Sequence, residues 1–357
     1  MTEVDLFLAE RRSASDARLE SFRQALLREI PPHERDELLG EHTCIYAVGS
    51  GGRRELSPHS DLDLFLVKQG EPRRVDEIRL QSAVLRALRA ESFEDPSNDA
   101  SFLKLHAAGA LVERLGEPRD DTENTFTVRM LLLLESRPLL GDRAHAELAR
   151  MSLDAYWKNV EGHREDYLPI VLFNDIVRYW RMLLLNYESK TAEKQRALDR
   201  RLPELSPEAR EKAERELEAD RNFRSYKLRF SRCLLCYSSV AYLMAEAHRT
   251  RVAKGRAHVT REVVDRMVRL TPLQRLEEAL SGAADAPGVT EAGESLRTLY
   301  AQFLRDTDRS KEDMLAIFSD RRGRRPFFTA AKDFGERMYD LIMALGRENP
   351  MFRYLVV

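Results

Sequence analysis

Residues 47–67, AVGSGGRRELSPHSDLDLFLV, decide the fold of the N-terminal part of this chain. An apolar run at 44–48 ends on the glycine-rich segment 49–52, and a second apolar run covers 62–67. Both runs are too short for a helix and are rich in strand-forming residues, which indicates buried strands. We therefore expect a strand, a glycine-rich turn and a second strand in this order.

Two features of this segment point to phosphate chemistry. A glycine-rich turn after a strand presents backbone N–H groups that bind phosphate oxygens. Asp61 and Asp63 are two residues apart, so a strand places both carboxylates on one face, about 7 Å from each other. Mg²⁺ binds a few carboxylates together with phosphate oxygens. The combination is typical of phosphoryl or nucleotidyl transfer.

The pattern of an apolar residue, Gly-Ser, ten further residues and Asp-x-Asp resembles the signature of the DNA polymerase β-like nucleotidyltransferase superfamily. The segment is most similar to PII-protein uridylyltransferases and glutamine-synthetase adenylyltransferases. In those proteins Arg, Glu-Leu, Pro and Ser-Asp-x-Asp follow the glycine-rich turn. The matching residues here are Arg53, Glu55-Leu56, Pro58 and Ser60-Asp61-Leu62-Asp63.

The sequence differs from the family pattern at one position and resembles the family over one further stretch. Arg54 replaces a glycine that is common at this point in the uridylyltransferases, so the details of the turn are open. Further along, residues 134–142 contain Leu-Glu-Ser-Arg and then Gly-Asp, similar to a stretch that follows the same domain in the uridylyltransferases. The likeness therefore reaches about residue 142, and beyond it the chain resembles helical substrate-binding domains only in a general way.

The resemblance also implies roles for single residues. Asp61 and Asp63 would hold Mg²⁺ or Mn²⁺. The nucleotide phosphates would lie on the glycine-rich turn, and Arg53 either contacts a phosphate or forms an ion pair with Glu55. The predicted phosphate-binding residues of the turn are Gly49, Ser50 and Gly51.

Two further roles are predicted outside this segment. The superfamily usually supplies a third carboxylate from a later strand, and the candidates are Asp95 and Asp99, which serve equally well as turn residues. A basic helix of the second domain often closes over the triphosphate in this superfamily. Lys227 is the first candidate for that contact, and a plain solvated face is the alternative.

The expected fold class is α+β, a small mixed-sheet domain of the polymerase β-like nucleotidyltransferase type followed by an all-helical domain. We place the first domain at 1–142, including an N-terminal amphipathic helix, and the second at 143–357. The second domain contains a charged insert at 189–220, either an exposed helical excursion or a mobile segment.

Within the first domain, periodicity predicts helices at 3–29 and 74–91 and a third strand at 101–106. Residues 125–140 are predicted as one helix that stops near Pro138 and Gly141. In the second domain, the spacing predicts a helix over 223–249.

Composition excludes several classes of protein. The 357 residues include 58 Lys or Arg and 60 Asp or Glu, for a net charge of −2, and 43% are apolar. No apolar run approaches the roughly 18 residues of a membrane span, and the N-terminus lacks the order of a signal peptide. Three cysteines are too few for a disulfide framework. We expect a cytoplasmic globular protein with no membrane partner.

Two basic segments stand out against this neutral total. Residues 221–261 hold ten Lys or Arg and one acid, a local charge of +9 that suits a polyphosphate or nucleic acid, or a solvated face. Residues 321–325, RRGRR, either contact RNA or phosphate or form a charged loop between helices.

The sequence thus predicts a Mg²⁺-dependent enzyme that moves a nucleoside monophosphate from ATP or another NTP to an acceptor hydroxyl and releases pyrophosphate. A protein acceptor is favoured, because the closest motifs belong to enzymes that modify proteins. RNA, a nucleotide or a small molecule is the alternative acceptor. A nucleotide-sensing interaction protein without catalysis is the other class. The base of the NTP and the oligomeric state are left open.

Overall fold

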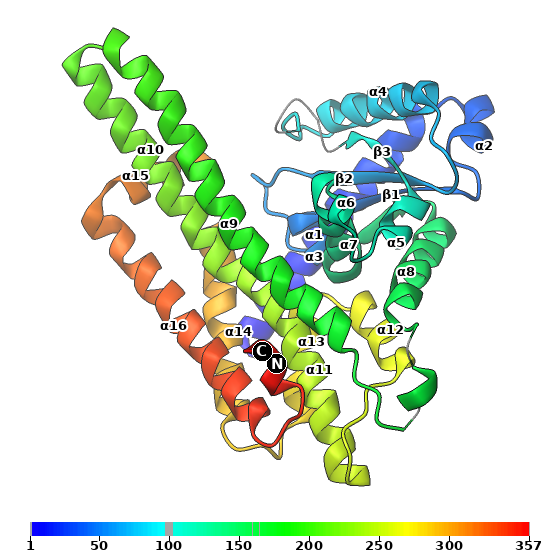
Figure 1. The fold of residues 1–357 in the computed structure, drawn as a ribbon. Coiled ribbons are helices and arrows are strands. Elements are labelled where there is room, and N and C mark those ends of the chain that lie inside the picture. Colours follow the sequence, from blue (N-terminus) through cyan, green and yellow to red (C-terminus); the bar gives the residue numbers. More distant parts are fainter. Residues whose placement is uncertain (1, 97–102, 159, 164, 357) are drawn as a thin grey trace. The chain divides into compact units, whose positions relative to one another are not determined.

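The computed structural model describes residues 2–356 apart from 97–102, 159 and 164. The chain divides into two compact units, each with its own set of helices (Figure 1). The first consists of Met1–Pro169 with Thr260–Thr271, and the second of Ile170–Val259 with Pro272–Val357. The boundary predicted after residue 142 falls inside the first unit.

The first unit is built around a four-stranded mixed sheet in the order β3-β2-β1-β4. Strand β1 is antiparallel to β2 and β4, and β2 is parallel to β3. The α+β class predicted from the sequence is therefore confirmed. The strands are β1 (Thr43–Val48), β2 (Asp63–Lys68), β3 (Leu105–Ala107) and β4 (Arg137–Leu140). The helices are α1 (Glu3–Glu29), α2 (Arg35–Leu38), α3 (Gly49–Arg53), α4 (Arg74–Ala90), α5 (Ala108–Glu113), α6 (Pro118–Thr122), α7 (Thr125–Glu135), α8 (Asp142–Tyr156) and α12 (Arg261–Arg269).

One face of this sheet packs against α1 and α4. Alternate residues of β1 and β2, such as Ile45, Ala47 and Leu64, join leucines and Phe22 of the two helices in one buried cluster. The side chains on one face of each strand thus pack against the apolar faces of α1 and α4. Both of these helices were predicted from the sequence within one residue of their observed ends.

The opposite face carries a row of four rings. Neighbouring ring centroids of His106, Phe65, Tyr46 and His145 lie 5.8, 5.8 and 5.4 Å apart, so the row runs from β3 across β2 and β1 to α8. Burial lowers the pKa of His106 and of His145 to about 4. Both imidazoles are therefore neutral in the folded protein near pH 7.

Because two neutral histidines are buried in this row, we expect the folded protein to lose stability in mild acid. An unfolded histidine takes up a proton near pH 6.5, whereas the folded pKa of each is about 4. The free energy of unfolding should fall as the pH drops from 6.5 to 4, by about 3 kcal/mol per histidine. Urea unfolding between pH 7 and 4.5 measures it. His145→Gln should remove about half of the fall, and the exposed control His33→Gln should leave it unchanged.

Two predictions about the first unit need correction. Residues 125–140 do not form one helix, because α7 ends at Glu135 and Arg137–Leu140 pairs with β1 as strand β4. Pro138 lacks an N–H group and disfavours a helical conformation at Arg137. The third strand is shorter than predicted, since β3 spans Leu105–Ala107. Residues 101 and 102 lie outside the described part of the chain.

Residues 260–271 return to the first unit through α12. The guanidinium of Arg261 donates to Asp154 on α8 at 2.9 Å and lies over the ring of Trp157, 5.4 Å from its centroid. A segment that is distant in sequence thereby becomes part of this unit, which no local pattern predicts.

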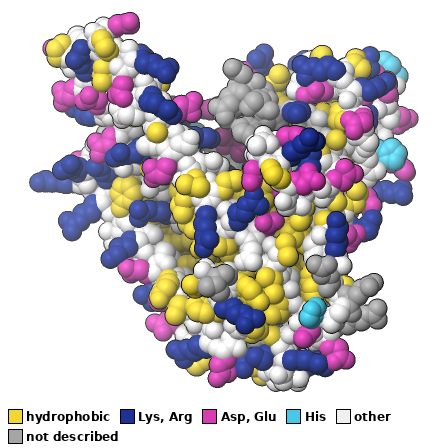
Figure 2. All heavy atoms as spheres, in the orientation of Figure 1, with side chains coloured by type: hydrophobic (Ala, Val, Ile, Leu, Met, Phe, Trp, Pro, Cys, Tyr) yellow, Lys and Arg dark blue, Asp and Glu magenta, His cyan; other side chains and the backbone are white. Residues whose placement is uncertain are grey.

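Among its described residues, the second unit contains helices joined by loops and no strand. Residues 189–220 extend α9 and begin α10, so the helical alternative for the charged insert is confirmed. Figure 2 shows basic and acidic side chains mixed along this hairpin. The helix predicted over 223–249 is interrupted by a π-helical turn, Leu228–Arg232. The helices are α9 (Ile170–Arg201), α10 (Pro207–Lys227), α11 (Cys233–Lys254), α13 (Pro272–Gly282), α14 (Val289–Asp306), α15 (Lys311–Ser319) and α16 (Arg321–Gly346).

Aromatic side chains fill the core around the π-helical turn. The rings of Phe230 and Phe303 stack with centroids 4.8 Å apart, and Tyr226 donates its hydroxyl to Asp306 at 2.9 Å. Among the described residues, no helix has the length and apolarity needed to cross a membrane.

Candidate functional site

The glycine-rich segment forms the short helix α3 directly after β1. Gly49 has a φ of +64°, which favours glycine, and a Cβ there would lie 2.9 Å from Oδ2 of Asp63. The carboxylate of Asp63 therefore lies against the first residue of the helix. The N-cap residue Val48 makes no side-chain capping hydrogen bond, and the first backbone N–H groups of a helix have no partners within the helix. Ser50, half-buried, is the second residue of the same turn.

Two further glycines fix how α3 packs. A Cβ on Gly52 would lie 1.6 Å from the carbonyl oxygen of Glu135, so the backbones of α3 and α7 are in direct contact. A Cβ on Gly51 would lie 2.9 Å from Leu62. Side chains larger than hydrogen are excluded at Gly52, which holds the turn against the end of α7.

Asp61 and Asp63 are exposed, whereas Leu62 and Leu64 are buried. This alternation places both carboxylates on the same side of the chain, as their spacing predicts. Strand β2 begins at Asp63, so Asp61 precedes the strand rather than lying within it. Since Val48 pairs with Asp63, the end of β1, the start of β2 and α3 meet at one edge of the sheet.

A tight turn and helix α1 position the residues before Asp61. The Ser60 N–H donates to the Ser57 carbonyl at 3.1 Å, and the Ser57 N–H donates to the Ser60 hydroxyl at 2.9 Å. On the α1 side, the Leu56 N–H donates to the Ser15 hydroxyl at 3.2 Å, and Arg18 donates to the Ser57 carbonyl. The Ser-Pro-His-Ser sequence is therefore a hydrogen-bonded turn that leads the chain to Asp61.

Arg53 forms the ion pair that the sequence left open. Its guanidinium donates to Glu55 at 2.7 Å and to Glu135 at 2.6 Å, and all three side chains are buried. This group ties the end of α3 to α7. A phosphate at Arg53 would have to compete with two carboxylates, so the structure gives the residue a positioning role.

Arg54 has a backbone conformation that favours glycine, the residue that the resemblance leads us to expect at this position. Its φ is +63°, a left-handed conformation that costs an ordinary residue about 1 kcal/mol. Its guanidinium pairs with Asp16 of α1, which also accepts from Arg137. Burial raises the pKa of Asp16, but the hydrogen bonds from the two arginines outweigh it, and the pKa is lowered. Asp16 belongs to no motif, so sequence reasoning missed it.

The third carboxylate is not identified among the described residues. Asp95 is exposed, and both of its oxygens accept from Arg89, at 3.2 and 3.0 Å, which lowers its pKa. Asp99 lies outside the described residues. Asp120 is buried and pairs with Arg129, so this acid is structural.

Lys104 is a candidate that the sequence analysis missed. It is exposed and directly precedes β3, and its charge contributes to the lowered pKa of His106. Since β3 is parallel to β2, the chain enters β3 at the edge where Asp63 begins β2. The feature of the sequence that could have identified Lys104 as a candidate is its position directly before a short strand.

Lys227 belongs to the second unit. It is exposed, and its ammonium lies 4.8 Å from the centroid of the Phe223 ring. On the preceding turn, Arg224 pairs with Asp220 at 2.9 Å. Lys227 is therefore an exposed residue that lies against an aromatic ring, and Arg224 pairs within its own helix.

The donor set at the sheet edge fits a magnesium ion that is shared with a nucleotide. The described residues contain no group of three or more His, Cys, Asp or Glu side chains arranged to hold a metal. Two exposed carboxylates remain, and Gly49 leaves the space beside Asp63 that a Cβ would fill. Asp61 and Asp63 thus offer oxygen ligands, with phosphate oxygens and water to complete the shell.

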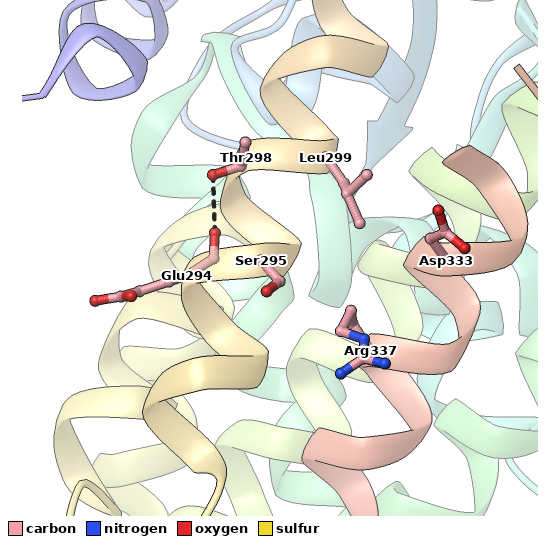
Figure 3. A pocket seen from close by; sticks show the side chains of 6 residues that line it. All are labelled: Glu294, Ser295, Thr298, Leu299, Asp333 and Arg337. Atoms are coloured by element: carbon pink, nitrogen blue, oxygen red, sulfur yellow. Dashed lines mark hydrogen bonds between the residues drawn. The ribbon is translucent and has the colours of Figure 1, made fainter. Parts of the chain in front are cut away.

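A groove of about 500 Å³ lies elsewhere, between α14 and α16 of the second unit (Figure 3). Arg337 on its wall pairs with Asp340 at 3.0 Å, and Thr298 donates to the carbonyl of Glu294 within its own helix. None of the predicted site residues line it, and we assign it no role. Its lining residues are Glu294, Ser295, Thr298, Leu299, Asp333 and Arg337.

Comparisons of the chain with models of protein families, with curated proteins and with solved structures find no match. The functional assignment therefore depends on the residues and their geometry.

Proposed function

We propose that the protein is a metal-dependent nucleotidyltransferase of the polymerase β-like type, which transfers a nucleoside monophosphate from an NTP to an acceptor hydroxyl. The observation that supports this most is the contact between the Asp63 carboxylate and Gly49 at the start of α3. Asp61 lies exposed on the same side of the chain. The proposal thus rests on a glycine-rich turn that contacts one of two exposed carboxylates.

In this proposal the turn binds the triphosphate. The N–H groups at the start of α3, those of Gly49 and Gly51 included, and the Ser50 hydroxyl donate to phosphate oxygens, and the absence of a side chain at Gly49 allows the backbone to approach them. Lys104, which directly precedes β3, contributes positive charge. Arg53 acts indirectly, because its ion pairs with Glu55 and Glu135 hold the turn in place.

The reaction forms a bond between the acceptor oxygen and the α-phosphorus and breaks the bridge to the β-phosphate. Pyrophosphate leaves with the electron pair, and the hydroxyl proton passes to a carboxylate or water. When bound, Mg²⁺ or Mn²⁺ neutralises charge on the triphosphate and polarises the acceptor oxygen. Asp61 and Asp63 would hold it. Catalysis then depends on positioning and charge rather than on a covalent intermediate.

Asp95 and Asp99 stay our candidates for the third carboxylate, which the superfamily usually supplies from a later strand. For the acceptor we favour a protein hydroxyl, because the motif is most similar to that of enzymes that modify proteins.

The three cysteines are free, in keeping with the cytoplasmic location that we propose.

The experiment supplies the pure protein with each NTP in turn, Mg²⁺ and cell lysate as the source of acceptor, and measures pyrophosphate release. We expect release with at least one NTP, dependent on lysate. Protease or nuclease treatment of the lysate then identifies the acceptor as protein or RNA. Nucleotide binding without release under any condition contradicts the proposal and indicates a nucleotide sensor.

Lys227 gives a separate prediction about nucleotide binding. If its ammonium contacts the triphosphate, Lys227→Ala should raise the Michaelis constant for the NTP about tenfold or more and change kcat little, because a contact made equally in ground and transition states is lost. Steady-state kinetics measures both constants. Lys212→Ala, at an exposed position on the same helix, is the matched control. An unchanged Michaelis constant would mean that Lys227 is a solvated residue.

A further inference from the structure

Two basic segments about a hundred residues apart in sequence come together in the second unit. Glu218 in the middle of α10 accepts from Arg324 of α16 at 2.8 Å. The charges of Arg221 and Arg321 also contribute to the lowered pKa of Glu218. Arg229 of the π-helical turn lies over the ring of Phe328 of α16, 5.9 Å from its centroid. The basic residues of α10 and of the RRGRR sequence therefore share one surface.

The RRGRR residues are the first turn of α16, so the loop alternative for residues 321–325 is wrong. Asp320 caps the helix by accepting from the Gly323 N–H at 2.7 Å, which explains why the helix begins here. Arg321, Arg322 and Arg325 are exposed. Among the described residues, no ion pair or side-chain hydrogen bond engages these three guanidinium groups.

The charge of this surface is unfavourable for the fold itself. Cations at the N-terminus of a helix oppose its dipole and destabilise the helix slightly. Two carboxylates lie beside them, and Glu218 pairs with Arg324 while Asp320 caps the helix. A bound polyanion would relieve the repulsion that remains. Charges that oppose the helix dipole and are only partly offset by nearby carboxylates are expected at functional surfaces.

Half-buried aromatic rings lie among these charges. Phe328 lies beneath Arg229, Phe223 beneath Lys227, and both rings pack on Phe318 with centroids 5.8 and 5.6 Å away. Proteins that bind single-stranded nucleic acids combine a cationic surface along the backbone with aromatic faces on which bases stack. Figure 2 shows basic side chains gathered at the left edge, where α16 begins.

We propose that this surface binds single-stranded RNA. We call it the arginine surface and define it by the exposed residues Arg221, Arg229, Arg321, Arg322 and Arg325. The arginines contact phosphates, and the adjoining rings accept stacked bases. The proposal does not depend on nucleotidyl transfer, because it concerns binding in the absence of NTP and of divalent metal.

The test is fluorescence anisotropy with a labelled 20-nucleotide RNA of mixed A and U, titrated with the full chain at several salt concentrations. Each phosphate contact contributes about −0.7 to the slope of log affinity against log salt concentration. Replacing Arg321, Arg322 and Arg325 together by Ala should weaken binding about tenfold or more and reduce the slope by about 2. These side chains are exposed, so we expect unchanged circular dichroism and melting temperature.

A matched control replaces Arg196, Arg200 and Arg215 by Ala, exposed arginines of the α9–α10 hairpin. This control removes the same charge and should leave affinity and slope near those of the wild type. Equal loss in both triple variants would mean that binding follows net charge, which overturns the proposal. Displacement of the RNA by polyglutamate of the same length at equal charge concentration would also overturn it, and would indicate an acidic protein partner instead.

Discussion

Replacing Asp61 or Asp63 by Asn should lower the rate of pyrophosphate release about a thousandfold or more and leave the fold intact. Both carboxylates are exposed at the sheet edge beside α3. Asn keeps the size of each side chain but removes the charge that a divalent cation needs. The loss corresponds to several kcal/mol of transition-state stabilisation. Initial rates with the preferred NTP and Mg²⁺ measure it.

Asp36→Asn is the control for this experiment. Asp36 is exposed on α2 of the same unit, and the substitution changes charge and shape in the same way. We expect wild-type turnover and melting temperature for the control, and a wild-type melting temperature for the two site variants. Turnover near the wild-type level in either site variant would remove that carboxylate from the proposed metal site.

Gly52→Ala should unfold the first unit or destabilise it by more than about 4 kcal/mol. The added Cβ would lie 1.6 Å from the Glu135 carbonyl oxygen and 3.0 Å from that of Ala47. Both neighbours are backbone atoms, so no side-chain rotation makes room. The shift of α3 away from α7 would also break the buried ion pairs of Arg53. Urea unfolding followed by circular dichroism measures the loss.

Gly335→Ala makes the same chemical change at a position that tolerates it. Gly335 lies within α16, and nothing lies within 4 Å of a Cβ added there. Alanine should stabilise the helix by about 0.5–1 kcal/mol. A Gly52→Ala protein as stable as the wild type would show that α3 and α7 do not pack as described.

The sequence predicted the parts of the site that depend on local pattern. Strands that flank a glycine-rich turn follow from short apolar runs, and the position of Asp61 and Asp63 on one side of the chain follows from their spacing. Pro138 was noted as a helix stop, but the strand that contains it, Arg137–Leu140, forms because it pairs with β1. Pairing between β1 and β4 is a long-range property that the local sequence does not encode.

The contacts around the turn could not be predicted for the same reason. Asp16 lies on a helix and Glu135 in a later one, and only the folded chain brings them to Arg54 and Arg53. The arginine surface likewise joins residues near 221 and 321. Sequence reasoning found both basic segments, but it gave no indication that they meet.

The most direct test of nucleotidyl transfer compares two labels on the preferred NTP. With label on the α-phosphate, the wild-type protein should transfer it to the acceptor in an amount equal to the pyrophosphate released. With label on the γ-phosphate, the acceptor should stay unlabelled. The Asp61→Asn/Asp63→Asn double variant should transfer neither label. Transfer of the γ-label would show phosphoryl transfer instead, and equal α-labelling by the double variant would contradict the site at Asp61 and Asp63.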